Sequence, residues 1–168
     1  MDRHTPLEAA KHPRTPLAGP YGHPFHPILV TIPIGTWVAS LIFDIIAGTS
    51  EDPTVFVTGA QALIAIGIIG GLLAAIFGLL DFVMIAAGTQ AKKTAVTHMA
   101  LNLGVVALFI INYFVRVGAE HDEVNVLGIV LSVIGLALLG MSGWLGGKLA
   151  YRYGVRVADE QTQAEGFR

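Results

Sequence analysis

Four long apolar segments constrain the fold of this chain more than any other feature of its sequence. They cover roughly residues 28–47, 60–87, 95–117 and 124–147. Each is long enough to cross a hydrocarbon core of about 30 Å as a helix, which takes around 20 residues. The connections between them are short, so successive helices must run antiparallel. The sequence therefore predicts an all-α fold, an integral membrane four-helix bundle.

The composition agrees with a protein whose main partner is the lipid bilayer. Of the 168 residues, 54% are hydrophobic and 13% are charged, whereas soluble domains carry roughly a quarter charged residues. The chain has no cysteine. This excludes thiolate zinc sites, cysteine-ligated iron–sulfur clusters and covalently attached c-type haem. We expect no nucleic-acid partner.

The chain divides into three parts by polarity. Residues 1–22 form a polar, proline-rich lead-in that we expect to be loosely ordered. Residues 23–152 form the transmembrane domain, and residues 153–168 form a polar tail. The second apolar segment is the longest, so its helix must tilt or protrude from the bilayer.

Basic residues are concentrated at the end of the bundle that carries the N-terminus. That end holds Arg3, Lys11, Arg14, Lys92, Lys93, Lys148, Arg152, Arg156 and Arg168. The other end holds Arg116 beside several acidic residues. Because basic loops stay on the cytoplasmic side, we expect both termini to be cytoplasmic in a bacterial inner membrane.

Two polar stripes have the same spacing on the first and third apolar segments. One comprises His26, Val30, Pro33, Trp37, Ser40 and Asp44, and the other His98, Asn102, Val105, Phe109, Asn112 and Arg116. Alternating steps of four and three place each set on one helix face. Both stripes span 18 residues, or ~27 Å of helix. The spacing predicts that His26 lies level with His98, and that Asp44 forms a structural ion pair with Arg116.

The histidine end of these stripes is the candidate site. In the run His23-Pro24-Phe25-His26-Pro27, Pro27 can open a helix and leave His26 as its cap. Asp81 lies ~9 Å inside the corresponding end of the second helix, where we expect no unclaimed arginine to pair with it. A carboxylate beside a histidine fixes its tautomer and makes it a better ligand.

Two cofactor forms follow from this cluster. In the metal form, His23, His26, Asp81 and His98 hold a divalent ion such as zinc, iron or copper. In the haem form, His98 and either His23 or His26 ligate a b-type haem non-covalently. Its propionates would then meet Lys92 and Lys93.

A purely structural interpretation accounts for the same residues. Histidines near a membrane interface can cap helix ends or bond to Asp81 and Asn102, and an ion pair can lock two helices in register. The small-x-x-x-small spacings Gly67/Gly71 and Gly143/Gly147 permit close helix contact, within one chain or in a homo-oligomer.

Several motifs together resemble a known bacterial membrane family. They are the stretch from His23 to Val30, Pro33-Ile34-Gly35, Gly78-Leu79-Leu80-Asp81, His98 with Asn102, and Ser142-Gly143-Trp144-Leu145-Gly146-Gly147. They resemble the family catalogued as domain of unknown function 2231, over about residues 22–157. The resemblance implies a four-helix membrane domain without an assigned biochemical role. Some relatives carry a Rieske-type or cytochrome-type domain on the same chain, which implies an association with redox chemistry.

The functional expectation is a small inner-membrane subunit that holds a haem or a metal ion for electron transfer, rather than a stand-alone enzyme. Its partner would be a membrane redox complex. The alternative is a non-catalytic structural or accessory subunit of a larger membrane complex. A transporter or proton relay through Asp81 and Asn102 is a third reading, which four helices without an inverted repeat disfavour.

Overall fold

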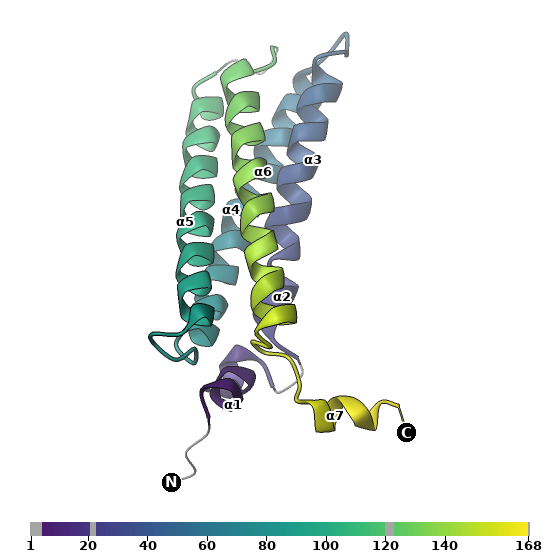
Figure 1. Ribbon diagram of the computed structural model, residues 1–168. Helices are drawn as coiled ribbons and strands as arrows, with labels where there is room; N and C mark the ends of the chain where they lie inside the picture. Colours follow the sequence, from purple (N-terminus) through teal and green to yellow (C-terminus); the bar gives the residue numbers. More distant parts are fainter. Residues whose placement is uncertain (1–4, 21–22, 120–122, 168) are drawn as a thin grey trace.

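The computed structural model describes residues 5–20, 23–119 and 123–167, and this part of the chain contains helices and no strand. Four helical spans stand side by side (Figure 1). They are α2 (Phe25–Leu29) with α3 (Thr31–Ala47), α4 (Thr54–Phe82), α5 (Gln90–Val117) and α6 (Val126–Gly147). Each is long and apolar enough to cross a membrane. The four-helix bundle predicted from the apolar segments is therefore present.

Two of the helices start well before the apolar segments that predicted them. α4 begins at Thr54, and α5 begins at Gln90 after an N-cap at Thr89. The Thr89 hydroxyl accepts a hydrogen bond from the Lys92 backbone N–H at 3.1 Å. Such a cap satisfies a free amide of the first turn. The first turn of a helix can therefore be polar, and a search for apolar segments misses such a turn.

The first span begins at Phe25, with Pro24 as its N-cap. His26 is consequently not the helix cap that the sequence predicted, because it lies inside the first turn. The helix is interrupted at Val30 and resumes as α3. Pro33 has no backbone N–H, so the Leu29 carbonyl loses its helical partner at this break. The two pieces remain one span, Phe25–Ala47.

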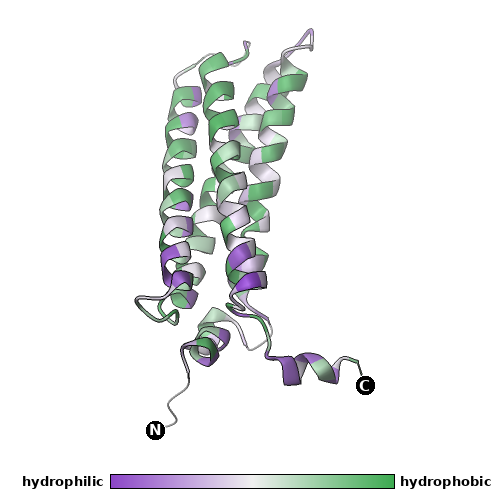
Figure 2. Ribbon diagram, viewed as in Figure 1, coloured by the Kyte–Doolittle hydropathy of each residue, from purple (hydrophilic) through white to green (hydrophobic). Residues whose placement is uncertain are grey.

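The long helices turn their large apolar side chains outward. Exposed examples are Ile28, Ile42, Ile45, Ile69, Ile76 and Phe114. Figure 2 shows the same pattern, with hydrophobic colour along the bundle and hydrophilic colour toward its lower end. A continuous apolar exterior of this size suits lipid and not water.

The centre of the bundle is an aromatic stack between α3 and α5. The rings of Trp37 and Phe109 lie 4.0 Å apart and 5° from parallel. The Trp37 indole N–H donates to the Ile64 carbonyl at 3.3 Å. Gly67 on α4 makes room for the indole, because a Cβ there would overlap it.

The two helical hairpins are built alike. The first consists of α2, α3 and α4, and the second of α5 and α6. Three pairs that meet between them are each 72 positions apart, namely His26/His98, Trp37/Phe109 and Asp44/Arg116. Since α3 and α5 run in the same direction, the hairpins are related by a quasi-twofold axis along the bundle, as in parallel repeats.

Short segments lie at one end of the bundle. α1 (Pro6–Lys11), the 3-10 turn η1 (Pro16–Ala18) and α7 (Glu160–Glu165) lie below the long helices in Figure 1. The π-helical turn η2 (Lys148–Arg152) joins α6 to the last of them. Thr5 and Glu8 cap α1 reciprocally, so the polar lead-in contains a short capped helix. Arg3 and Arg168, which entered the charge count, lie outside the described residues.

Candidate functional site

His26 and His98 meet across the quasi-twofold axis. Their ring centroids are 6.2 Å apart and the planes are nearly perpendicular, at 89°. His98 is eight residues from the start of α5 at Gln90, a depth of ~12 Å along the helix. The equal 18-residue spacing in the two stripes placed these two rings at the same level, and the structure has them there.

Both rings are anchored through Nδ1 to a main-chain carbonyl of the neighbouring helix. His26 Nδ1 lies 2.8 Å from the Ala74 oxygen on α4, and His98 Nδ1 lies 2.8 Å from the Ser142 oxygen on α6. A carbonyl oxygen only accepts, so each Nδ1 carries the hydrogen. In a neutral imidazole this leaves the lone pair on Nε2. Histidines that bind metals are commonly oriented by the same kind of bond.

Glycines give each ring its place against the neighbouring helix. A Cβ on Gly78 would lie 2.9 Å from His26 Nδ1, and a Cβ on Gly146 would lie 3.2 Å from His98 Cε1. Gly78 and Gly146 are 68 positions apart, as are the carbonyl acceptors Ala74 and Ser142. Each hairpin therefore holds its histidine ring in the same way, with a carbonyl acceptor and a glycine at matching positions.

The two histidines differ at Nε2. The Asn102 amide nitrogen lies 3.1 Å from His98 Nε2 and also donates to the His98 carbonyl at 2.9 Å. The position equivalent to Asn102 in the first hairpin is Val30, which has no polar side chain. His26 Nε2 accordingly has no hydrogen-bond partner among the described residues. The Nε2 lone pair of His26 is thus free among the described residues, whereas that of His98 accepts from the Asn102 amide.

Asp81 has an ionic partner, and the expectation that no arginine reaches it was wrong. Arg156 Nε lies 3.0 Å from Asp81 Oδ1. The arginine comes from the tail, which folds back under the bundle and places its guanidinium against α4. Asp81 is three residues beyond Gly78, or one helical turn closer to the end of α4.

The other expected ligands are not gathered around the pair. His23 precedes α2 and is exposed. Lys92 Nζ donates to the Phe82 carbonyl at 2.9 Å and lies 3.4 Å from the centre of the Phe82 ring. Lys93 is exposed. Within residues 5–20, 23–119 and 123–167, no three histidine, aspartate or glutamate side chains are grouped to hold a metal ion.

At the far end of the bundle, Asp44 and Arg116 form a fully satisfied ion pair. Both guanidinium Nη atoms lie 2.7 Å from the carboxylate oxygens. Arg116 Nε donates to the Asn112 side-chain oxygen at 2.9 Å, and the Asn112 amide donates to Ser132 at 2.8 Å. All four side chains are buried. This network holds α3, α5 and α6 together.

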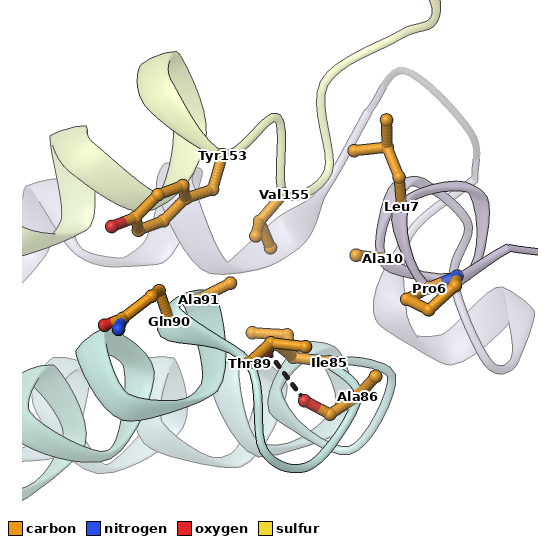
Figure 3. Close-up of a pocket in the computed structure, with 10 residues that line it drawn as sticks. All are labelled: Pro6, Leu7, Ala10, Ile85, Ala86, Thr89, Gln90, Ala91, Tyr153 and Val155. Atoms are coloured by element: carbon orange, nitrogen blue, oxygen red, sulfur yellow. Dashed lines mark hydrogen bonds between the residues drawn. The ribbon is translucent and has the colours of Figure 1, made fainter.

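A cavity of about 260 Å³ opens at the same end as the histidines, but it is a separate feature (Figure 3). Its lining comes from α1, from the α4–α5 connection and the start of α5, and from the segment after η2: Pro6, Leu7, Ala10, Ile85, Ala86, Thr89, Gln90, Ala91, Tyr153 and Val155. Neither histidine reaches it. Its lining contains no histidine and no carboxylate.

Comparison with known proteins places the chain in a family. The family described as predicted membrane protein (DUF2231) matches residues 22–159. The chain belongs to this family, which confirms the resemblance drawn from its motifs. No curated protein and no solved structure matches the chain.

Proposed function

We propose that this member of a predicted membrane protein family holds one transition-metal ion between His26 and His98. The ion would be zinc, iron or copper, the metals that imidazole ligands suit. With iron or copper, the protein would serve as an electron-transfer subunit of a membrane redox complex. The rest of the coordination shell would be completed from outside the pair, as at metal sites that keep open positions.

The proposal rests on the observation that the two hairpins hold their histidine rings in the same way. Each hairpin supplies one imidazole, fixes its Nδ1–H on a carbonyl, and clears space for it with a glycine. The ring centres are 6.2 Å apart. Two imidazoles on one ion, with metal–nitrogen bonds of ~2.0–2.1 Å, have ring centres about 5–6 Å apart. The observed separation of 6.2 Å is close to that range.

The residues fit a bare ion better than a b-type haem. A porphyrin needs a cavity, and the cavity of about 260 Å³ at this end is lined by neither histidine. Lys92, expected beside a propionate, is bonded to the Phe82 carbonyl. A bare ion bound at His98 Nε2 would displace the Asn102 amide from it. The chemistry that an ion supplies is redox exchange for iron or copper and a fixed positive charge for zinc.

Elemental analysis and an absorption spectrum of the detergent-purified protein test this proposal. We expect close to one equivalent of a transition metal per chain and no Soret band. A Soret band would restore the haem form on the same histidines. Metal-free protein that also fails to bind added Zn²⁺ or Cu²⁺ would favour the alternative, a non-catalytic accessory subunit.

We further propose that the end carrying α1 and α7 faces the cytoplasm of a bacterial inner membrane. Described basic residues at this end include Lys11, Arg14, Lys93, Lys148 and Arg152, whereas Arg116 at the other end is buried against Asp44. Arg116 therefore adds no free positive charge to the loops at its end. Because basic loops are retained in the cytoplasm, the end with the exposed basic residues is expected to be cytoplasmic.

Cysteine labelling tests the orientation, because the chain has no native cysteine. Glu123 and Gln161 are both exposed, at opposite ends of the bundle. In intact spheroplasts, a membrane-impermeant maleimide should label Glu123→Cys and leave Gln161→Cys unlabelled until the membrane is permeabilised. The reverse pattern would invert the topology.

A further inference from the structure

The described part of the chain contains two buried ion pairs of very different quality. Asp44–Arg116 is bidentate at 2.7 Å and has further hydrogen-bond partners. At Asp81–Arg156, the Nε–Oδ1 distance is 3.0 Å, but the two atoms are not aligned for a hydrogen bond. Asp81 Oδ1 and the Arg156 atoms Nε and Nη1 are all buried without hydrogen-bond partners. Buried polar groups are rarely left in this state.

Arg156 also joins the segments that lie at this end of the bundle. Its Nη2 donates to the carbonyls of Ala18 and Gly19, both at 3.1 Å. Its backbone N–H donates to the Ala10 carbonyl at 3.0 Å. Its own φ is +60°, a left-handed conformation that is unfavourable for a residue with a side chain. One strained, 9%-exposed residue therefore ties the lead-in, the tail and α4 together.

Asp81 of the second ion pair lies on the same face of α4 as the residues next to His26. Ala74, Gly78 and Asp81 follow one another at steps of four and three on α4, so they share one face of the helix. Ala74 accepts from His26 and Gly78 touches its ring. Asp81 is one turn closer to the end of α4. A cation that enters along this face meets Asp81 before it meets His26.

We propose that the Asp81–Arg156 pair is the gate of the histidine site. This inference rests on the proposed function. The Arg156 guanidinium is paired with the Asp81 carboxylate. A divalent ion that moves toward His26 replaces the guanidinium at this carboxylate. With Arg156 in place, its positive charge repels the ion inside a low-dielectric region, where charges interact strongly. The contact with Asp81 contains no aligned hydrogen bond, so the carboxylate can exchange the guanidinium for an incoming ion while Nη2 keeps its two carbonyl partners.

The test follows the binding of Co²⁺ to metal-stripped, full-length protein in detergent by stopped-flow visible absorption. Arg156→Gln should raise the association rate about 10-fold or more, the scale of electrostatic effects on association. Arg156→Lys keeps the charge and should stay within about 3-fold of the native rate. Arg152→Gln is the matched control, because it removes an exposed arginine from the same end. It should change the rate less than about 2-fold.

A second readout follows the gate without any metal. Ala18, whose carbonyl accepts from Arg156, is 1% exposed. Ala18→Cys should react slowly with a maleimide in the native background and at least about 10-fold faster with Arg156→Gln. Unchanged labelling would contradict a closing role for Arg156, even if the variant were too unstable for kinetics.

The outcomes separate the gate from the site. His98-dependent Co²⁺ binding with equal rates in Arg156→Gln and Arg152→Gln would reject the gate and keep the site. Absence of His98-dependent binding in the native protein and in every variant would reject the metal site, and the gate with it. Faster binding in Arg156→Gln alone supports both.

Discussion

Asp44→Asn alone and Arg116→Leu alone should each lower the free energy of unfolding in detergent by about 3–5 kcal/mol, the cost of breaking a buried ion pair. Both side chains are at most 2% exposed. Removing either partner leaves the other charge buried and unpaired. For Asp44→Asn, the stranded guanidinium retains its bond to Asn112 but loses both carboxylate contacts.

The double variant Asp44→Asn/Arg116→Leu should cost clearly less than the two single changes combined, because no stranded charge remains. Reversible unfolding followed by circular dichroism measures all three. Glu51→Gln is the control at the same end of the bundle, since Glu51 is exposed. Its effect should stay within about 0.5 kcal/mol. Strictly additive single effects would mean that the two charges do not interact.

His26→Ala and His98→Ala should each reduce affinity for the bound ion by more than about 100-fold, beyond the 10- to 100-fold typical of outer-shell changes. Each removes one of only two imidazoles that face each other. Titration of metal-stripped protein with Co²⁺ measures the loss. In the haem form expected from the sequence, His23 could take the place of His26 as a ligand.

In the structure His23 precedes α2 and is exposed, whereas His26 faces His98. His23→Ala is therefore the matched control and should leave affinity within about 2-fold of native. Asp81→Asn should weaken binding less than either histidine change, because Asp81 pairs with Arg156 and the imidazoles are held by carbonyls. If His23→Ala abolished binding while His26→Ala did not, the ligand assignment would be wrong.

Helical periodicity was sufficient to predict the pairs that join the first span, α2 with α3, to α5. Equal spacing along two parallel helices placed His26 beside His98, and it placed Asp44 beside Arg116. These predictions depend only on the rise of a helix and on antiparallel connections. The same reasoning placed Asp81 near the histidine end, one turn beyond the glycine that touches His26.

The sequence did not predict the features that depend on backbone atoms or on contacts between distant segments. The carbonyls of Ala74 and Ser142 anchor the histidines, and any residue carries a carbonyl. Arg156 reaches Asp81 only because the tail folds back with φ +60° at that residue. The repeat was hidden because the offset is 72 in the first helices and 68 in the second. Matching glycines at Gly78 and Gly146 were the available signal.

The central claim is that His26 and His98 share one ion. X-ray absorption at the metal edge of protein loaded with one equivalent of Zn²⁺ or Cu²⁺ tests it most directly. Native protein should show the multiple scattering of two imidazoles with nitrogen at about 2.0 Å. His98→Ala, loaded at the same protein concentration, should lose one of them or remain metal-free. Identical imidazole scattering in native protein and His98→Ala would contradict a shared site.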